Sequence, residues 1–177
     1  MLKKLLLVLG FAIFVFLAYA IYTQVTKTSC RSLRLECHKE TVVFERVYFK
    51  EKVHAFQEAI RTQGLVVDLE TQKSHYAPSK LFERLDLNEV RNILIREFGE
   101  TPSKDSLRLH VLIYENDPLD PGKKTKEAKL YAGYVVFSFF EGADLVYKIQ
   151  IDFMDKKGED IAKRIACAKA SLMALEG

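Results

Sequence analysis

An uncharged apolar run near the start of the chain limits what this protein can be. Residues 5–22 contain no charged, amide or proline side chain, and Lys3 and Lys4 precede them. A helix of that length rises about 27 Å, close to the bilayer's hydrocarbon thickness of about 30 Å. We therefore predict a basic leader over residues 1–4 and a single N-terminal transmembrane helix over residues 5–22, which contacts membrane lipid.

The same run also fits an export signal that is removed after translocation. Ala18 and Ala20 flank Tyr19 in the small-x-small pattern of a cleavage site, so cleavage near Ala20 is the alternative to an anchor. Tyr19 and Tyr22 suit an interfacial aromatic belt, which favours retention. Basic residues lie on both sides of the run, so the distribution of positive charge does not decide its orientation. A short basic start followed by an apolar run resembles an export signal, which favours a domain outside the cytoplasm. We expect a single-pass inner-membrane protein with its C-terminal domain in the periplasm.

The remainder of the chain has the size of one domain. We expect a juxtamembrane segment over residues 23–40 and a single domain over residues 41–177. The formal net charge of the chain is +3, and two of the positive charges are Lys3 and Lys4. Acidic and basic residues alternate through the domain, whereas nucleic-acid binding needs a basic stripe. We predict no nucleic-acid partner.

Hydrophobic periodicity predicts an α+β domain, with amphipathic helices on one face of a mostly antiparallel sheet. Asp86 and Gly99 have the residue types of a helix N-cap and C-terminal stop, and they delimit a helix over residues 87–98. We expect strands over residues 41–48, 65–69, 107–114, 129–140 and 145–153, and further helices over residues 50–63 and 158–177.

Three cysteines set the candidate cross-links. Cys30 and Cys37 lie close together in the sequence, and in an oxidising compartment they form a candidate disulfide if the chain turns between them. Two unpaired thiols are the alternative. Cys167 lies in an alanine-rich helical pattern and is interpreted as a small buried apolar side chain. Neither a CxxC motif nor a second histidine at ligand spacing accompanies His38, so we predict no metal site.

A long polar segment separates two predicted strands. Two prolines and a glycine exclude regular structure in the loop from Tyr114 to Lys129, and loops of this length are typically solvated and mobile or bind a partner. Its spacing of carboxylates does not match a calcium-binding EF-hand. The residues of this candidate interaction loop are Glu115, Asp117, Asp120, Lys123, Lys124 and Lys126.

The sequence contains no recognisable catalytic, phosphate-binding or cofactor-binding motif. We expect a membrane-anchored, extracytoplasmic, non-catalytic module that binds or supports another envelope protein, without a cofactor. The alternatives are a small-ligand or lipid-binding domain, or an enzyme with an atypical site near His110. Arg108, His110 and Tyr114 share one face of a predicted strand and form the alternative ligand site.

Overall fold

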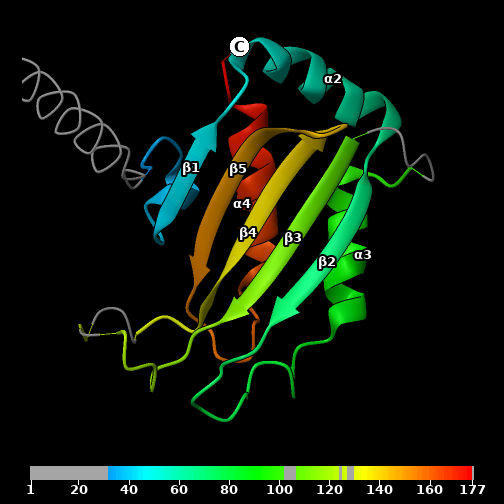
Figure 1. Cartoon of the computed structure of the whole chain (residues 1–177). Coiled ribbons are helices and arrows are strands. Elements are labelled where there is room, and N and C mark those ends of the chain that lie inside the picture. Colours follow the sequence, from blue (N-terminus) through cyan, green and yellow to red (C-terminus); the bar gives the residue numbers. More distant parts are fainter. Residues whose placement is uncertain (1–31, 102–106, 124, 127–129, 177) are drawn as a thin grey trace, which may run out of the picture. The chain divides into compact units, whose positions relative to one another are not determined.

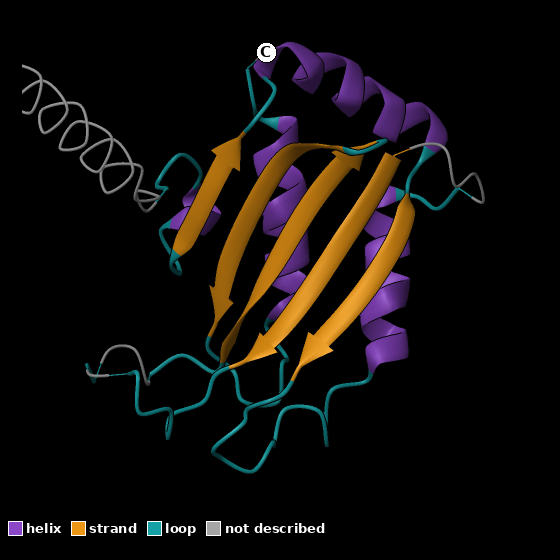
Figure 2. Cartoon of the chain, in the orientation of Figure 1, coloured by secondary structure: helices purple, strands orange, loops and turns teal. Residues whose placement is uncertain are grey.

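Within the residues that the structure describes, a five-stranded mixed sheet and three α-helices form an α+β fold (Figures 1 and 2). The structure is a computed structural model that describes residues 32–101, 107–123, 125–126 and 130–176. The predicted α+β class is confirmed at this level. The predicted transmembrane helix, and the alternative cleavage site near Ala20, lie outside the described residues. Among the described residues, no helix has the length and apolar character needed to cross a bilayer.

The strands lie in the order β1-β5-β4-β3-β2. Neighbours pair antiparallel except β2 and β3, which are parallel. The parallel pair follows from the crossover helix α3, which returns the chain to the starting end of the sheet before β3 begins. The strand bounds are β1 (Val43–Val47), β2 (Val66–Gln72), β3 (Leu107–Glu115), β4 (Gly133–Glu141) and β5 (Asp144–Phe153).

Helices α3 (Leu87–Phe98) and α4 (Ile161–Met173) cover one face of the sheet, and α2 (Val53–Gln63) lies across one end (Figure 1). Short 3-10 turns, η1 (Glu36–His38) and η2 (Lys50–Lys52), precede β1 and α2. The buried ring of Phe139 on β4 packs against aromatic rings of α2, α3 and β5. Its centroid lies 6.2 Å from that of Phe56 on α2, 5.6 Å from that of Phe98 on α3 and 5.8 Å from that of Tyr147 on β5.

Helix α3 has the bounds that its sequence predicts. The carboxylate of Asp86 accepts hydrogen bonds from the backbone N–H groups of Asn88 and Glu89, at 2.8 and 3.3 Å. Gly99 ends the helix with φ at +73°, a conformation that favours glycine. Val90 and Leu94 of this helix are buried in the core, whereas Leu87, its first residue, is 37% exposed.

Close packing at the start of β4 requires a glycine. A Cβ atom on Gly133 would lie 2.1 Å from the carbonyl oxygen of Tyr114 and 2.4 Å from the Phe153 ring. Any other residue would therefore separate β4 from β3 or displace the ring. Gly133 pairs with Glu115 and Phe153 in register, and it begins β4 later than the sequence pattern predicts.

Candidate functional site

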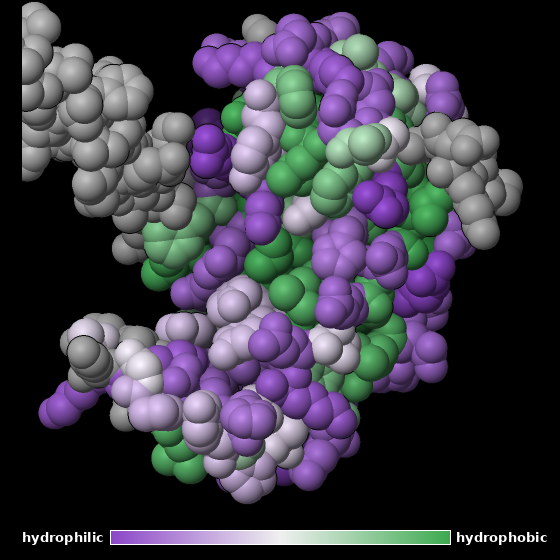
Figure 3. All heavy atoms as spheres, viewed as in Figure 1, coloured by the Kyte–Doolittle hydropathy of each residue, from purple (hydrophilic) through white to green (hydrophobic). Residues whose placement is uncertain are grey.

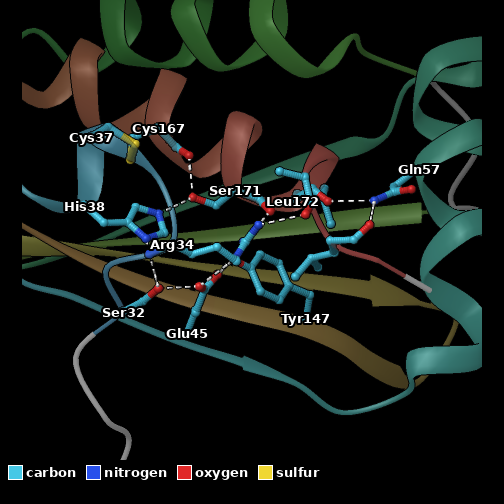
Figure 4. Close-up of polar contacts among 12 residues, drawn as sticks. Ser32, Arg34, Cys37, His38, Glu45, Gln57, Tyr147, Cys167, Ser171 and Leu172 are labelled. Carbon is cyan, nitrogen blue, oxygen red and sulfur yellow. Dashed lines mark hydrogen bonds and ion pairs between the residues drawn. A yellow bond between two sulfur atoms is a disulfide. The ribbon is translucent and has the colours of Figure 1, made fainter.

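A disulfide joins the start of the described chain to its last helix. Cys37 on η1 bonds to Cys167 on α4, with the two Cα atoms 5.9 Å apart (Figure 4). Cys37 therefore takes Cys167 as its partner rather than Cys30, which lies outside the described residues. Cys167 is a cross-link and not the unpaired apolar side chain that the sequence suggested. The partners are 130 positions apart in the sequence, and only the packing of η1 against α4 brings them together.

Beside the disulfide, an ion pair ties the N-terminal segment to the sheet. Arg34 donates two hydrogen bonds to the Glu45 carboxylate on β1, at 2.8 and 3.1 Å. Ser32 and the Tyr147 hydroxyl also donate to that carboxylate. Burial alone would raise the pKa of Glu45, but the hydrogen bonds from Arg34, Ser32 and Tyr147 lower it to about 2. Burial and the Glu45 charge raise the pKa of Tyr147, so its hydroxyl remains a donor.

His38 is completely buried between two serine hydroxyls. Its Nδ1 lies 2.9 Å from Ser32 Oγ and its Nε2 lies 2.7 Å from Ser171 Oγ. Each hydroxyl already donates its one hydrogen, Ser32 to Glu45 and Ser171 to the Cys167 carbonyl. A neutral imidazole has one N–H and so donates to one of the two hydroxyls, whereas a doubly protonated imidazole donates to both. Burial nevertheless lowers the pKa of His38, the Glu45 charge raises it and Arg34 lowers it further.

Two side chains from elsewhere in the chain cap the C-terminal end of α4. Arg34 donates to the carbonyl oxygens of Ser171 and Ala174, at 2.7 and 2.9 Å. Gln57 on α2 donates to the carbonyl oxygen of Leu172, at 2.8 Å (Figure 4). The last carbonyl groups of a helix have no partner within the helix, so these contacts satisfy them. We call Ser32, Arg34, Cys37, His38, Glu45, Cys167 and Ser171 the N-terminal latch.

The latch also contains three side chains of metal-binding type. The donor atoms of Cys37, His38 and Cys167 all lie within 4.8 Å of one another. Both sulfur atoms are consumed in the disulfide, and a metal would need them as thiolates. In the oxidised protein this group is therefore a cross-link beside a histidine.

The structure divides the candidate interaction loop into buried and exposed parts. Glu115 and Asp117 are only 6% and 2% exposed, and they accept backbone N–H groups from the segment 74–81. Asp120 accepts within its own turn, from Gly122. Lys123 donates to the side chain of Asn116. Lys126 is exposed, and Lys124 lies outside the described residues.

The alternative ligand site lies on the face of the sheet opposite α3 and α4, but its members have separate partners. The guanidinium of Arg108 lies over the Phe140 ring, 4.6 Å from its centroid. His110 Nε2 lies 3.0 Å from a carboxylate oxygen of Glu70 on β2. Tyr114 stacks on Tyr134, with centroids 4.4 Å apart. The structure thus places the three predicted residues along one strand face, without bringing them around a common cavity.

That face, which we call the open face, is defined by strand register and covered by no described helix (Figures 1 and 3). Hydrophobic side chains lie among hydrophilic ones over its central strands (Figure 3). Charge changes sign across it, from Arg46 and Lys148 on β1 and β5 to Asp68 and Glu70 on β2. Its partly exposed apolar residues are Phe44, Val66, Leu112 and Phe140.

Comparisons with protein-family models, with curated proteins and with solved structures found no match to this chain. The functional argument therefore depends on the chain's own residues.

Proposed function

We propose that this protein is a membrane-anchored, extracytoplasmic, non-catalytic module that binds or supports another envelope protein through the open face. The observation that carries the proposal is the open face itself. It presents the apolar side chains Leu112 and Phe140 on its central strands, and charged residues of opposite sign lie on β1 and β5 and on β2. Contact surfaces between proteins combine exposed apolar side chains with polar and charged ones.

The disulfide supports the extracytoplasmic part of the proposal. Structural disulfides persist in oxidising compartments and are rare in reducing ones. The Cys37–Cys167 bond joins the segment that follows the apolar run to the body of the domain. A domain displayed outside the cytoplasm on an anchor at residues 5–22 accounts for the apolar run and the cross-link together.

One observation favours the catalytic alternative near His110. The contact between His110 and Glu70 resembles the histidine–carboxylate pair that orients a general base. The pair lies on the open face, and the nearest aligned hydroxyl, Ser138, is 7% exposed. Loss of turnover in a His110→Ala variant would support the catalytic alternative, whereas partner binding by this variant does not separate the two, because His110 itself lies on the open face.

Position-specific photo-crosslinking in the protein's own cells tests the proposal. A photoreactive amino acid replaces Leu112 or Phe140 on the open face of the full-length chain. The matched control places it at Asn92, which is exposed on α3 behind the sheet. We expect the same envelope protein to be cross-linked from both open-face positions and not from Asn92. Absence of that product from both positions, or equal yield from Asn92, refutes the open face as the binding surface.

The compartment is tested separately. A membrane-impermeant protease added to intact spheroplasts should cleave the domain of the full-length protein, and the domain should remain with the membrane when salt is added. Protection from the protease refutes the extracytoplasmic orientation. Release by salt refutes the anchor.

A further inference from the structure

A cavity of about 340 Å³ lies at the end of the sheet where β3 ends and β4 begins. It is formed by three stretches of chain: the segment 74–81, the segment 115–119 and residues 131–132, with Lys156 beside them. Much of its lining is apolar. The apolar residues that line it are Ala77, Pro78, Leu81, Pro118, Leu119 and Ala132.

Three consecutive buried residues hold the walls of this cavity. The Glu115 carboxylate accepts the backbone N–H groups of Lys80 and Leu81, at 2.7 and 2.9 Å. The Asp117 carboxylate accepts those of His75 and Ala77, at 2.8 and 3.2 Å. Each carboxylate thus fixes the segment 74–81 against the segment that ends β3.

Asn116 connects the third wall. Its side chain donates to the Tyr131 carbonyl oxygen at 2.7 Å, and its backbone N–H donates to the Ala132 carbonyl oxygen at 2.8 Å. Glu115, Asn116 and Asp117 therefore join all three stretches, and the cavity exists before any ligand arrives. A preformed apolar cavity with few polar groups is the usual form of a small-ligand site.

The charges around the cavity favour an anion. Lys80 and Lys156 line it, both are exposed, and neither forms a salt bridge within the described part of the chain. Glu115 also lines it, and its charge is held at the wall by backbone N–H groups. Burial raises the pKa of Glu115, but the backbone hydrogen bonds from Leu81, Lys80 and Ser74 outweigh burial and lower it.

We propose that this cavity binds a small aliphatic carboxylate, with its chain among the apolar walls and its carboxylate at Lys80 and Lys156. One water molecule occupies about 30 Å³ of liquid volume, so about 340 Å³ corresponds to roughly eleven groups of that size, which accommodates a chain of eight or nine carbons. This site is distinct from the open face, and it stands or falls independently of the function proposed above.

Octanoate is the test ligand, because its ten non-hydrogen atoms match the cavity. The full-length chain, held in lipid nanodiscs with labelled leucine and alanine methyl groups, is titrated by NMR. We expect saturable shifts of the Leu81, Leu119, Ala77 and Ala132 methyl signals. The neutral alcohol 1-octanol has the same chain and partitions into the same lipid, so it separates the role of charge from apolar contact.

Charge-removing variants sharpen the test. Lys80→Gln and Lys156→Gln should each weaken octanoate binding by up to about fivefold, the upper end of the range for an exposed ion pair, and leave 1-octanol binding unchanged. Lys163→Gln is the matched control, because Lys163 is exposed on α4 and does not line the cavity. Ala77→Leu should abolish octanoate binding by filling the cavity.

Three results would overturn the proposal. The first is the absence of saturable shifts in the unmodified protein. The second is binding of 1-octanol as tight as that of octanoate, which removes the role of the lysines. The third is an equal effect of Lys163→Gln and Lys80→Gln, which assigns the lysine effect to net charge. None of these results bears on cross-linking from the open face, so the two proposals fail separately.

Discussion

Removal of the Cys37–Cys167 disulfide should destabilise the domain strongly. The bond closes a loop of 130 residues. The loop-closure model assigns about 5 kcal/mol to a loop of that length, and measured losses for native disulfides are about 2–5 kcal/mol. Most of this difference arises in the unfolded chain, because the hydrogen bonds of Arg34 and His38 keep η1 beside α4 in the folded state.

Urea pulse proteolysis of the full-length protein in a non-ionic detergent measures the effect. With a urea m-value of about 2 kcal/mol per molar, a loss of about 4 kcal/mol lowers the unfolding midpoint by about 2 M. Reducing agent should lower the midpoint of the unmodified protein by the same amount as the double variant Cys37→Ala/Cys167→Ala. It should have no further effect on that variant, because both treatments remove one bond.

The third cysteine provides the control. Cys30→Ala should retain the midpoint of the unmodified protein and its sensitivity to reducing agent. A large loss in Cys30→Ala, or an unchanged midpoint in the double variant, refutes the pairing and the reasoning from loop closure. Peptide mapping under non-reducing conditions should recover one cross-linked pair that contains Cys37 and Cys167.

Three further predictions concern acid sensitivity and packing. Glu45→Gln should lower the stability of the protein at pH 7. Folding lowers the pKa of Glu45 from 4.5 to about 2, so the unmodified protein loses stability between about pH 5 and pH 2, and the variant should lose less over that interval. Thermal midpoints across the pH range measure this. The pKa of His38 in the folded protein lies below 6.5, so the unfolded chain takes up the proton first and the thermal midpoint of the unmodified protein falls between pH 7.5 and 5.5. His38→Gln should reduce this fall. An equal fall of the midpoint in both proteins contradicts the prediction. Gly133→Ala should destabilise the protein by about 3 kcal/mol, because the added methyl group clashes with the Tyr114 carbonyl oxygen. Gly142→Ala should cost about 1 kcal/mol, because its methyl group would meet no atom within 4 Å but Gly142 has φ at +58°. Urea unfolding midpoints rank the two variants.

Local patterns in the sequence predicted the elements whose causes are local. Helix α3 begins and ends where Asp86 and Gly99 indicate, because capping depends on residues within one turn of each end. Apolar residues at every second position of β3 likewise identify its buried face, because successive side chains of a strand point to opposite sides of the sheet. The hairpin of β4 and β5 follows from a short turn centred on Gly142.

The parallel pairing of β2 with β3 was not predicted, although its signal was present. A strand, a helix and a second strand follow one another from Val66 to Glu115, which is the order of a parallel crossover unit. The antiparallel expectation came from the three later strands, whose order is not interrupted by a helix. The sheet is therefore mixed: three of its strand pairs are antiparallel, in line with the mostly antiparallel sheet that was expected, and one is parallel.

Contacts between distant segments account for most of what sequence reasoning missed. Closeness in sequence favoured Cys30 as the partner of Cys37, but η1 packs on α4, and Cys167 lies there. Glu115 and Asp117 resembled solvated loop charges because their partners are backbone N–H groups 34 to 42 positions away. Backbone donors leave no mark on side-chain composition, so no pattern within the loop could have indicated that these carboxylates are buried.

The Cys37–Cys167 bond also determines how the chain responds to mechanical load. A pull applied between Ser32 and the C-terminal residues passes through the two sulfur atoms, so the 130-residue stretch between them cannot lengthen while the bond is intact. At about 3.5 Å per residue, roughly 450 Å of contour length is withheld from extension. When its two ends are pulled apart, the oxidised protein could extend only outside the stretch between Cys37 and Cys167.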